Sequence, residues 1–412
     1  MPHPRPSAAF RRAFTPVGAA ILCATLAAGC AAEGTGSTAG LPQPTTTPSP
    51  AAIVPGKVFK TLPPDPVDQA ERVLGALARQ AEARALAQPP QARPEPIDVV
   101  GETDSWRAGA AYNGIFADPD IVRHDGRWLA YATNTSHYRL PTLTSDDLTT
   151  WRPITDGDGR TFDPLPEVGD WVQGNNGGSG LWAPAVAKIG DGWTAAYSAQ
   201  ISTVAGQRHN CIGLARAEQP GGPFQHLGPP AVCAPESRLG VIDPDLYVDA
   251  LGIPWMLWKF SGVHNSRPAA VFSRQLNPDG TGWAEGSETY EILTHQGGWE
   301  GNTIENPSMV TFRGVTYLFY SGNAYTTDAY ATGYAICAGP AGPCTRPSSA
   351  PLLDNATTGH LGPGGATAFV QGDSLRLAYH AWEPGQVNRL RRLHIAGLWQ
   401  REDSTLELEN AG

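Results

Sequence analysis

Three carboxylates in this chain stand one or two residues before a proline, each just ahead of an apolar run. Asp118 and Asp243 directly precede a proline, and Glu305 stands two residues before one. Carboxylates gathered at one place suit either a hard cation, which binds oxygen ligands, or glycoside hydrolysis, in which one carboxylate is base or nucleophile and another is the acid. A third carboxylate tunes such an acid, because a like charge nearby raises a pKa. Either chemistry requires a fold that brings the three residues together.

The phrase that contains these acids recurs along the chain. In each copy an apolar run follows a proline, a short turn intervenes, and a second apolar run follows. The prolines are Pro119, Pro184, Pro244, Pro307 and Pro363, about 60 residues apart. Five repeats of this length with several short strands each are typical of a β-propeller. The alternative, a β-sandwich, does not repeat at the length of a blade. We therefore predict an all-β, five-bladed propeller over residues 104–412, with Asp118, Asp243 and Glu305 at one mouth of its central channel.

These motifs resemble those of glycoside hydrolase family 43, five-bladed propellers that act on arabinose- and xylose-containing glycans. The resemblance runs from about residue 114 to residue 400. Beside the proline phrases it rests on Trp182-Ala183-Pro184, Cys211-Ile212-Gly213-Leu214-Ala215, Gly222-Pro223-Phe224, Gly342-Pro343-Cys344 and Tyr379-His380-Ala381-Trp382. It implies that Asp118 is the general base, Glu305 the general acid, and Asp243 the residue that orients the acid and modulates its pKa. It also implies inversion, with base and acid about 6.5–9.5 Å apart.

The chain departs from the family's usual residues at three places. Gly365 stands where many members have a histidine, Asn306 where the residue is often small, and Ala185 where an acid usually follows the proline. These departures bear on the substrate and leave the reaction class intact. We expect an exported, inverting hydrolase of pentose linkages in polysaccharides, an α-L-arabinofuranosidase or arabinanase. The alternatives are a β-xylosidase of the same fold, a propeller that only binds carbohydrate, and a fructan-type propeller that retains configuration.

Three further residues are candidates for substrate binding, each with a structural alternative. Trp182 would stack on a sugar ring or pack between blades. Asn323 would bind sugar hydroxyls or cap a strand. His380 would line the pocket floor or fill the core. The resemblance implies that a structural calcium ion in the central channel is possible, since such a histidine helps hold one in some relatives. We expect no required cofactor.

Other charged residues near the motifs are expected to be structural. Asp120 and Asp245 follow Asp118 and Asp243 by two residues, and Glu300 lies outside the proline phrase. We expect these three acids to form hydrogen bonds of the inner strands or to face solvent in loops. The arginine-rich segment 388–392 is expected to close the last blade rather than to bind substrate.

The first 103 residues lie outside the predicted propeller. Residues 1–29 have the arginines and apolar run of a signal peptide, and they end before Cys30 in a sequence similar to a bacterial lipobox. We expect lipid at Cys30; the alternative is an ordinary signal peptide cut nearby, and both imply export. Residues 30–64 are rich in Pro, Thr, Ser and Gly, and predict a disordered tether. Residues 65–103 predict one amphipathic helix, beginning at Asp65-Pro66, and a linker.

Charge and cysteine content limit the partners. A formal charge of −10 and the lack of a basic stripe exclude nucleic acid, and no segment past the N-terminus is apolar enough to span a bilayer. The expected partner is a polysaccharide or oligosaccharide, with membrane contact only through a lipid anchor and a monomeric chain. The four cysteines of the propeller allow three pairings. We predict Cys211–Cys233 and Cys337–Cys344, because each pair closes a local loop within one repeat; four free thiols are the alternative.

Overall fold

The structure is a computed structural model that describes residues 109–173, 180–204, 207–237, 239–263 and 266–409. The expected signal peptide (1–29), the lipid anchor at Cys30, the tether (30–64) and the helix with its linker (65–103) lie outside the described residues. None of the helices in the described ranges has the length and apolar character needed to cross a bilayer.

The described chain forms five antiparallel sheets. The first contains β1 (Asp120–His124), β2 (Arg127–Tyr131), β3 (Thr142–Ser145) and β4 (Arg152–Pro153). The second contains β5 (Leu181–Ile189), β6 (Gly192–Val204), β7 (Gln207–Ala217) and β8 (Gln225–His226), with β9 (Val232–Cys233) also paired to β7. The third contains β10 (Val241–Val248), β11 (Pro254–Phe260), β12 (Ala270–Gln275) and β13 (Thr289–Thr294). The fourth contains β14 (Ile304–Phe312), β15 (Val315–Gly322), β16 (Ala331–Cys337) and β17 (Cys344–Thr345). The fifth contains β18 (Leu361–Gln371), β19 (Ser374–Trp382), β20 (Arg391–Gln400) and β21 (Leu406–Leu408).

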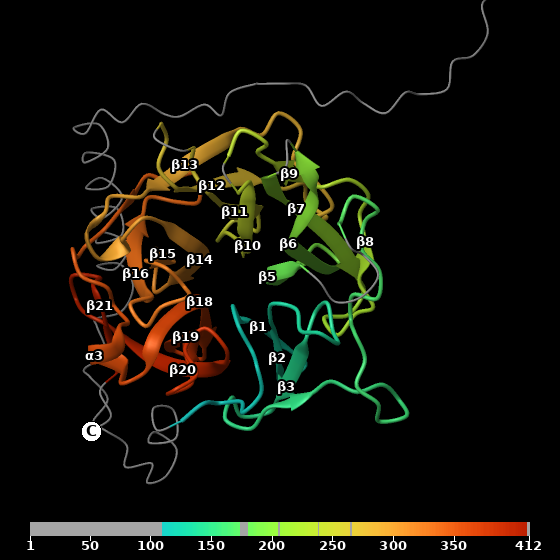
Figure 1. The fold of residues 1–412 in the computed structure, drawn as a ribbon, viewed down its shortest axis with the longest axis horizontal. Helices are drawn as coiled ribbons and strands as arrows, with labels where there is room; N and C mark the ends of the chain where they lie inside the picture. Colours follow the sequence, from blue (N-terminus) through green and yellow to red (C-terminus); the bar gives the residue numbers. More distant parts are fainter. Residues whose placement is uncertain (1–108, 174–179, 205–206, 238, 264–265, 410–412) are drawn as a thin grey trace, which may run out of the picture. The chain divides into compact units, whose positions relative to one another are not determined.

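The five sheets are the blades of a propeller, which confirms the predicted fold (Figure 1). The first strand of each blade lies nearest the middle. Strand β1 contacts β5 and β18, β10 contacts β5 and β14, and β14 contacts β18, so the inner strands form a closed ring. The described helical segments are short: η1 (Gly298–Glu300) leads into β14, and α3 (Asn355–Thr358) leads into β18.

The core is divided among the gaps between blades. Each of five clusters of buried apolar side chains draws its members from two neighbouring sheets. Between the first two blades, for example, Tyr131 of β2 lies in one cluster with Trp193 and Tyr197 of β6. A blade buried on both faces requires nearly continuous apolar strands, as in β16, where every residue is buried. Each large side chain buried in this way stabilises the fold by roughly 1.5–3 kcal/mol.

The segment before β1 pairs with the last blade. The backbone N–H of Ala111 donates to the carbonyl of Leu393 at 2.7 Å, and the N–H of Phe116 donates to that of Arg391 at 2.9 Å. Both acceptors belong to β20. The described chain is therefore tied at its beginning to the blade in which it ends, as the expectation for residues 388–392 requires.

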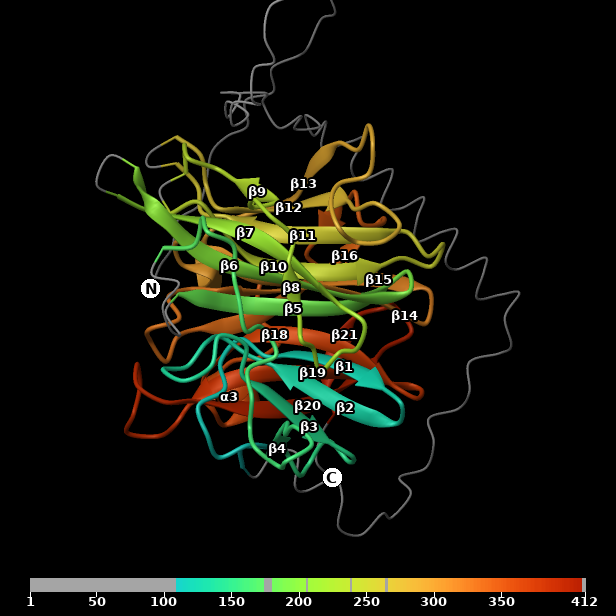
Figure 2. The same cartoon turned by 90° about the vertical axis from the view of Figure 1, so that its right-hand side faces the viewer.

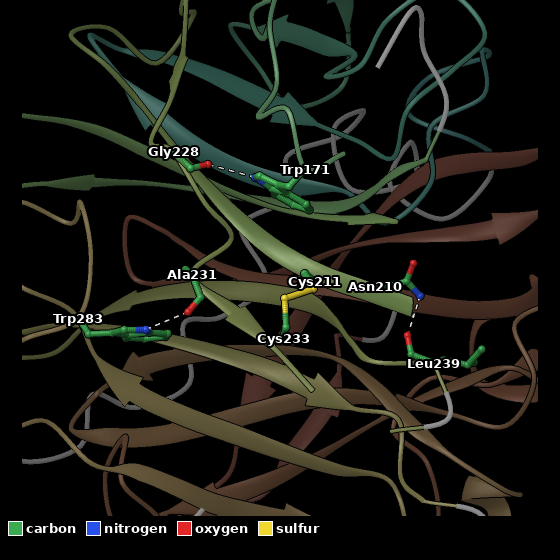
Figure 3. The surroundings of a disulfide bond; sticks show 8 residues. All are labelled: Trp171, Asn210, Cys211, Gly228, Ala231, Cys233, Leu239 and Trp283. Atoms are coloured by element: carbon green, nitrogen blue, oxygen red, sulfur yellow. Dashed lines mark hydrogen bonds between the residues drawn. A yellow bond between two sulfur atoms is a disulfide. The ribbon is translucent and has the colours of Figure 1, made fainter. Parts of the chain in front are cut away.

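Two disulfides fasten the outer strands, with the predicted pairing. Cys211–Cys233 joins β7 to β9, and Cys337–Cys344 joins β16 to β17. Around the first bond, side-chain donors of neighbouring segments reach backbone carbonyls: Trp171 donates to Gly228, Asn210 to Leu239 and Trp283 to Ala231 (Figure 3). The hairpin end of β6 and β7 projects beyond the neighbouring strands (Figure 2).

Candidate active site

One backbone feature positions the predicted catalytic residues. In every blade one residue at the start of the inner strand has a positive φ. It directly precedes the motif proline in blades one to four: Asp118 (51°), Ala183 (41°), Asp243 (55°) and Asn306 (49°). In blade five the strand register gives this place to Gly365 (58°), because Gly364 pairs with His380 as Glu305 pairs with Ser321. Such angles are uncommon for residues other than glycine. The strand pairing is irregular at this point in blades two to five. Five occurrences at equivalent places show that the turn belongs to the blade itself.

This equivalence refines the expected placement of the acids. Asp118 and Asp243 hold the positive-φ position in their blades, whereas Glu305 lies one residue earlier and Asn306 holds that position in blade four. Glu305 pairs with Ser321 in the sheet, as Trp182 pairs with Ser198 in blade two. Asn306, treated in the sequence only as a departure from the family, is therefore placed like the two aspartates.

Asp118 is held as a carboxylate. Thr133 Oγ1 donates to its Oδ2 at 2.6 Å, and Arg391 Nη1 lies 3.2 Å from its Oδ1. Its own backbone N–H donates to Nδ1 of His380 at 3.0 Å. Burial alone would raise the pKa of Asp118, but the charge of Arg391 and the contacts with His380 and Thr133 hold it well below its ordinary value. Asp118 is therefore ionised at neutral pH, as a general base must be.

Glu305 accepts hydrogen bonds at both of its oxygens. Lys259 Nζ lies 2.7 Å from Oε2, and the Tyr330 hydroxyl donates to Oε1 at 2.8 Å. All three side chains are buried. Although burial by itself lowers the pKa of Lys259, the charge of Glu305, joined by that of Asp243 where Asp243 is ionised, raises it above its ordinary value. A charged lysine thus lies beside the proposed acid.

Asp243 is in the opposite state to Asp118. Its Oδ2 accepts from the backbone N–H of Asn306 at 3.0 Å, and its own N–H donates to Ser198 Oγ at 2.8 Å. Burial raises the pKa of Asp243 to about 8, and the charge of Glu305 adds to the rise, while Lys259 opposes it. Asp243 is therefore protonated at neutral pH. Two carboxyls of one mouth are held in different protonation states by their surroundings.

The amide of Asn306 lies between the base and Asp243. Its Nδ2 lies 3.3 Å from Asp118 Oδ1 and 3.2 Å from the Tyr330 hydroxyl. Turned over, the amide donates instead to Asp243 Oδ2 at 3.1 Å. Since Tyr330 also contacts Glu305, Asn306 and Tyr330 connect the three carboxyls into one network. The three acids that are far apart in the sequence are therefore neighbours, as predicted.

A pocket opens at this network, in the centre of the propeller. It encloses about 270 Å³ with its open mouth included, and all five blades contribute to it. The lining residues are Asp118, Pro119, Ala183, Pro184, Ala185, Pro244, Asp245, Asn306, Pro307, Gly365, Ala366 and Thr367. The residues around the motif prolines of blades one to four thus surround the site. In blade five the equivalent residues begin three positions after the predicted place, so that Ala366 and not Pro363 corresponds to the motif proline.

The acids expected to be structural are bound to backbone or to arginine. Asp120 Oδ2 accepts from the N–H of Val186 at 2.6 Å, and Asp245 Oδ2 from that of Met309 at 2.8 Å, each in the next blade. Burial raises the pKa of Asp120 to about 7 and that of Asp245 to about 8. Glu300 is buried and pairs with Arg346 Nε at 2.6 Å.

The three predicted substrate contacts have different surroundings. Trp182, at the start of β5, is partly exposed. Asn323 follows β15, and its side-chain oxygen accepts from the N–H of Ala324 at 2.9 Å, the capping arrangement that was its alternative. His380 is fully buried and stacks on Tyr330 with ring centroids 5.7 Å apart. Its imidazole lies under the base rather than on an open surface.

A calcium ion does not fit at His380. Nδ1 lies 3.0 Å from the backbone nitrogen of Asp118, and Nε2 lies 3.5 Å from Arg391 Nη1. A cation at one ring nitrogen would meet a backbone N–H, and at the other it would meet the positively charged guanidinium. Within the described ranges no group of three or more His, Cys, Asp or Glu side chains is arranged to hold a metal.

Four residues of the network were missed or misjudged in the sequence. Arg391 belongs to the segment expected only to close the last blade, yet it also contacts Asp118. Thr133, Lys259 and Tyr330 have no motif of their own. Thr133 and Lys259 could have been found from the repeat, because they end or follow the second apolar run of their blades. Tyr330 reaches the site from the residue before β16, and no spacing rule points to it.

The comparisons with known proteins agree with this geometry. The model of the family described as Glycosyl hydrolases family 43 matches residues 111–405. No curated protein matches the chain. Among solved structures, a thermostable family-43 glycoside hydrolase is similar at 22% identity and a TM-score of 0.60, over 74% of this chain and 96% of that one.

Two further structures come from named organisms. An endo-1,4-β-xylanase of Bacteroides thetaiotaomicron is 25% identical with a TM-score of 0.57, over 74% of this chain and 97% of that one. An α-L-arabinanase of Cellvibrio cellulosa, complexed with arabinohexaose, is 18% identical with a TM-score of 0.56, over 72% and 95%. Because the family match spans nearly all of the described propeller, this chain belongs to the glycosyl hydrolases of family 43 and is a glycoside hydrolase, in a family for which inversion is general.

Proposed function

We propose that this protein is an exported hydrolase of pentose polysaccharides, an α-L-arabinofuranosidase or arabinanase. The observation that carries the proposal is the state of three carboxyls joined in one hydrogen-bonded network: Asp118 is ionised, while Asp243 is protonated and lies beside Glu305. An inverting glycosidase needs one carboxylate to receive a proton and a second carboxyl to give one. The arabinanase among the similar structures, with its bound arabinohexaose, supports an arabinose-containing substrate.

In the proposed reaction Asp118 is the general base. Its carboxylate takes a proton from a water molecule, whose oxygen attacks the anomeric carbon. Thr133 and Arg391 hold the carboxylate by its oxygens, so it cannot rotate away from that water. The guanidinium also keeps Asp118 ionised, which a base requires before each turnover.

Glu305 is the general acid in this proposal. It gives its proton to the glycosidic oxygen as the bond to the anomeric carbon breaks. Tyr330 and Lys259 fix its two oxygens, and Asp243 orients it through the shared network. Trp182 and Asn323 remain the proposed substrate contacts, with Trp182 as the stacking surface. His380, which is fully buried, supports the base from beneath and does not reach the substrate.

Export is part of the proposal. The N-terminal sequence has the pattern of a lipoprotein signal that ends at Cys30. The two disulfides support the same compartment, since such bonds persist mainly in oxidising surroundings. The propeller would then act outside the cytoplasm on a polysaccharide, as a monomer tethered by lipid or released. Labelling with a radioactive fatty acid, compared with Cys30→Ala, tests the anchor.

The activity is tested by sugar release from linear arabinan, debranched arabinan, arabinoxylan, xylan and a mycobacterial-type arabinogalactan. We expect release from an arabinose polymer, abolished by Asp118→Asn and Glu305→Gln but not by Asp125→Asn, which changes an exposed turn. Release from xylan alone would identify a β-xylosidase instead. Proton NMR of the first product should show the inverted anomer; the retained anomer would favour a covalent mechanism. If the folded protein released nothing from any polymer, the proposal would fail for these linkages.

The acid is tested separately with Glu305→Ala. A leaving group that departs without a proton does not need the acid. Glu305→Ala should therefore keep much more activity on a dinitrophenyl glycoside than on the natural polymer. An equal loss on both substrates would contradict the assignment of Glu305.

A further inference from the structure

In every blade one residue in the second strand, or just after it, occupies the same structural place opposite the start of the inner strand. These residues are Thr133, Ser198, Lys259, Ser321 and His380. Four of them are located by their pairing with the start of the inner strand: Ser198 with Trp182, Lys259 with Ile242, Ser321 with Glu305, and His380 with Gly364. Thr133 follows β2 by two residues and its N–H donates to Ala117. We call them the ring residues.

Four ring residues form the same kind of hydrogen bond. Each accepts a backbone N–H from the inner strand of the next blade: Thr133 from Ala183 at 3.0 Å, Ser198 from Asp243 at 2.8 Å, Ser321 from Gly365 at 2.9 Å and His380 from Asp118 at 3.0 Å. A buried N–H left without an acceptor is costly. The ring residues therefore join each blade to the next.

Lys259 is the exception, because an ammonium group has three donors and no acceptor. It cannot receive the backbone N–H of the next blade. That N–H belongs to Asn306, and Asp243 Oδ2 accepts it instead at 3.0 Å. The ammonium reaches past this position to Glu305, at 2.7 Å. Lys259 therefore cannot accept the backbone N–H that the other ring residues accept, and it lies next to the proposed acid.

Burial makes the exception more informative. The side chain of Lys259 is 6% exposed and that of Glu305 is 11% exposed. Removing two charges from water costs more than their attraction often returns, so a buried ion pair is weak evidence for a stabilising role. A serine, which ring positions in blades two and four have, would satisfy the Asn306 N–H with no buried charge. Stability alone therefore does not explain this lysine.

We propose that Lys259 is a positioning residue of the reaction: its ammonium, with Tyr330, holds the Glu305 carboxylate and limits Glu305 and Asp243 to one shared proton. The inference rests on the proposed function of this site. The three groups together carry no net charge: the Lys259 ammonium is positive, one carboxyl is ionised, and the other keeps the proton. Burial favours this neutral state over a charged one. Because Glu305 accepts at both oxygens in the resting site, the proton rests on Asp243. It must pass to Glu305, leaving Asp243 ionised, before Glu305 gives it to the leaving oxygen.

Other charged or titratable groups also face this pair. Tyr330 donates to Glu305 from the segment before β16, the charge of Asp118 in blade one acts on Asp243, and His380 in blade five interacts with Glu305. All of them remain when Lys259 is replaced. The change in behaviour on replacement therefore reports the ammonium.

The decisive variant is Lys259→Ser, which gives blade three the residue that blades two and four already have. If Lys259 were merely structural, a hydroxyl that can accept the Asn306 N–H would preserve activity. We expect the variant to remain folded, to lose about tenfold or more of kcat on a natural substrate, and to lose much less on a dinitrophenyl glycoside. Equal losses on both substrates, or no loss, would overturn the proposal. Lys259→Met, which keeps the length of the side chain without its charge, should behave alike.

The pH profile provides a second readout. Lys259 opposes the rise in the pKa of Asp243, so its removal raises that pKa further. The alkaline limb of kcat/KM should therefore move upward by about one pH unit or more in Lys259→Ser. Ser321→Ala, which removes a ring acceptor but no charge, is the matched control and should leave that limb in place. An unmoved limb in Lys259→Ser would contradict the proposal.

A titration without substrate separates this inference from the proposed function. Carbon-13 NMR of the side-chain carboxyls, with Asp243→Asn and Glu305→Gln to assign the signals, follows the pair directly. The signal of Asp243 should titrate at higher pH in Lys259→Ser than in the wild-type protein. If the wild-type protein hydrolysed nothing, the proposed function would fail. The titration would still show whether Lys259 lowers the pKa of Asp243. An unchanged titration would refute the role of Lys259 even in an active enzyme.

Discussion

His380 fills the space that a side chain at position 365 would occupy, so only glycine fits there. A Cβ built on Gly365 would lie 2.6 Å from Nδ1 and Cε1 of His380 and 2.7 Å from Oδ1 of Asp118. Atoms do not approach that closely without displacement. The histidine that many family members carry at this place therefore cannot be accommodated here, and His380 supports the base in this chain.

The first prediction is that Gly365→Ala impairs catalysis through this contact. The new methyl group must displace the His380 ring or the Asp118 carboxylate, so we expect kcat to fall about tenfold or more. Both the contact and the positive φ act on stability, and the φ alone costs roughly 1–2 kcal/mol. Gly372→Ala is a matched control, because Gly372 has a similar φ of 57° and nothing within 4 Å of its added Cβ. Equal kcat in the two variants would show that the contact does not matter.

The second prediction concerns Arg391 and the acid limb of the pH profile. Arg391 lowers the pKa of Asp118, and the base works only when ionised, above that pKa. Arg391→Met should therefore raise the pKa of Asp118 and move the acid limb of kcat/KM to higher pH. Arg391→Lys, which keeps the charge, should move it less. Arg392→Met is the control, since Arg392 pairs with Glu383 at 2.6 Å. An acid limb that stays in place in Arg391→Met would mean that another group keeps the base ionised.

The fold could be predicted from the sequence because a recurring proline motif marks the start of the inner strands. An acid or small residue, a proline and an apolar run mark the start of each inner strand, and five copies at blade length leave few alternatives. The disulfides followed from the same repeat. The positive φ before the prolines of blades one to four could not be read from residue types, since Asp118, Ala183 and Asn306 all adopt it. That conformation is imposed by the packing of five blades around one axis.

The site was predictable only in part, for a physical reason. The three acids lie on the repeat, so their position follows from the symmetry of the blades. Their protonation states depend on partners such as Arg391 and Tyr330, which come from other blades. Lys259 shows the limit most clearly. It lies at a repeat position where the other blades have serine, threonine or histidine, and only the aligned blades show that it differs.

The third prediction is that Asp245 makes the fold less stable at alkaline pH. Burial raises the pKa of Asp245 to about 8, so the folded protein holds its proton where the unfolded chain has lost it. The stability from this group is complete below the unfolded pKa near 4 and is lost as pH rises to about 8, by at most about 1.4 kcal/mol per pH unit. Asp245→Asn can still accept from Met309 without ionising. Urea unfolding should show it equal to wild type near pH 4 and more stable at pH 8.

The matched control for Asp245 is Asp373→Asn, in an exposed turn. Its stability should follow that of the wild-type protein at every pH. A difference between Asp245→Asn and wild type that does not grow between pH 4 and pH 8 would show that Asp245 is ionised in the folded protein.

The last prediction ranks the two disulfides. A bond that closes a longer loop removes more entropy from the unfolded chain. Cys211–Cys233 spans 22 residues and Cys337–Cys344 spans 7, so loop entropy predicts costs of about 3 and about 2 kcal/mol on removal. Both bonds join neighbouring strands of one blade, and Cys211 and Cys337 are similarly buried. Cys344 is buried whereas Cys233 is half-buried, so packing acts against the ranking that loop entropy predicts. Urea unfolding of Cys211→Ala/Cys233→Ala and Cys337→Ala/Cys344→Ala measures the two costs. If the shorter loop proved the more costly, packing of the sulfur atoms between blades would outweigh chain entropy in this propeller.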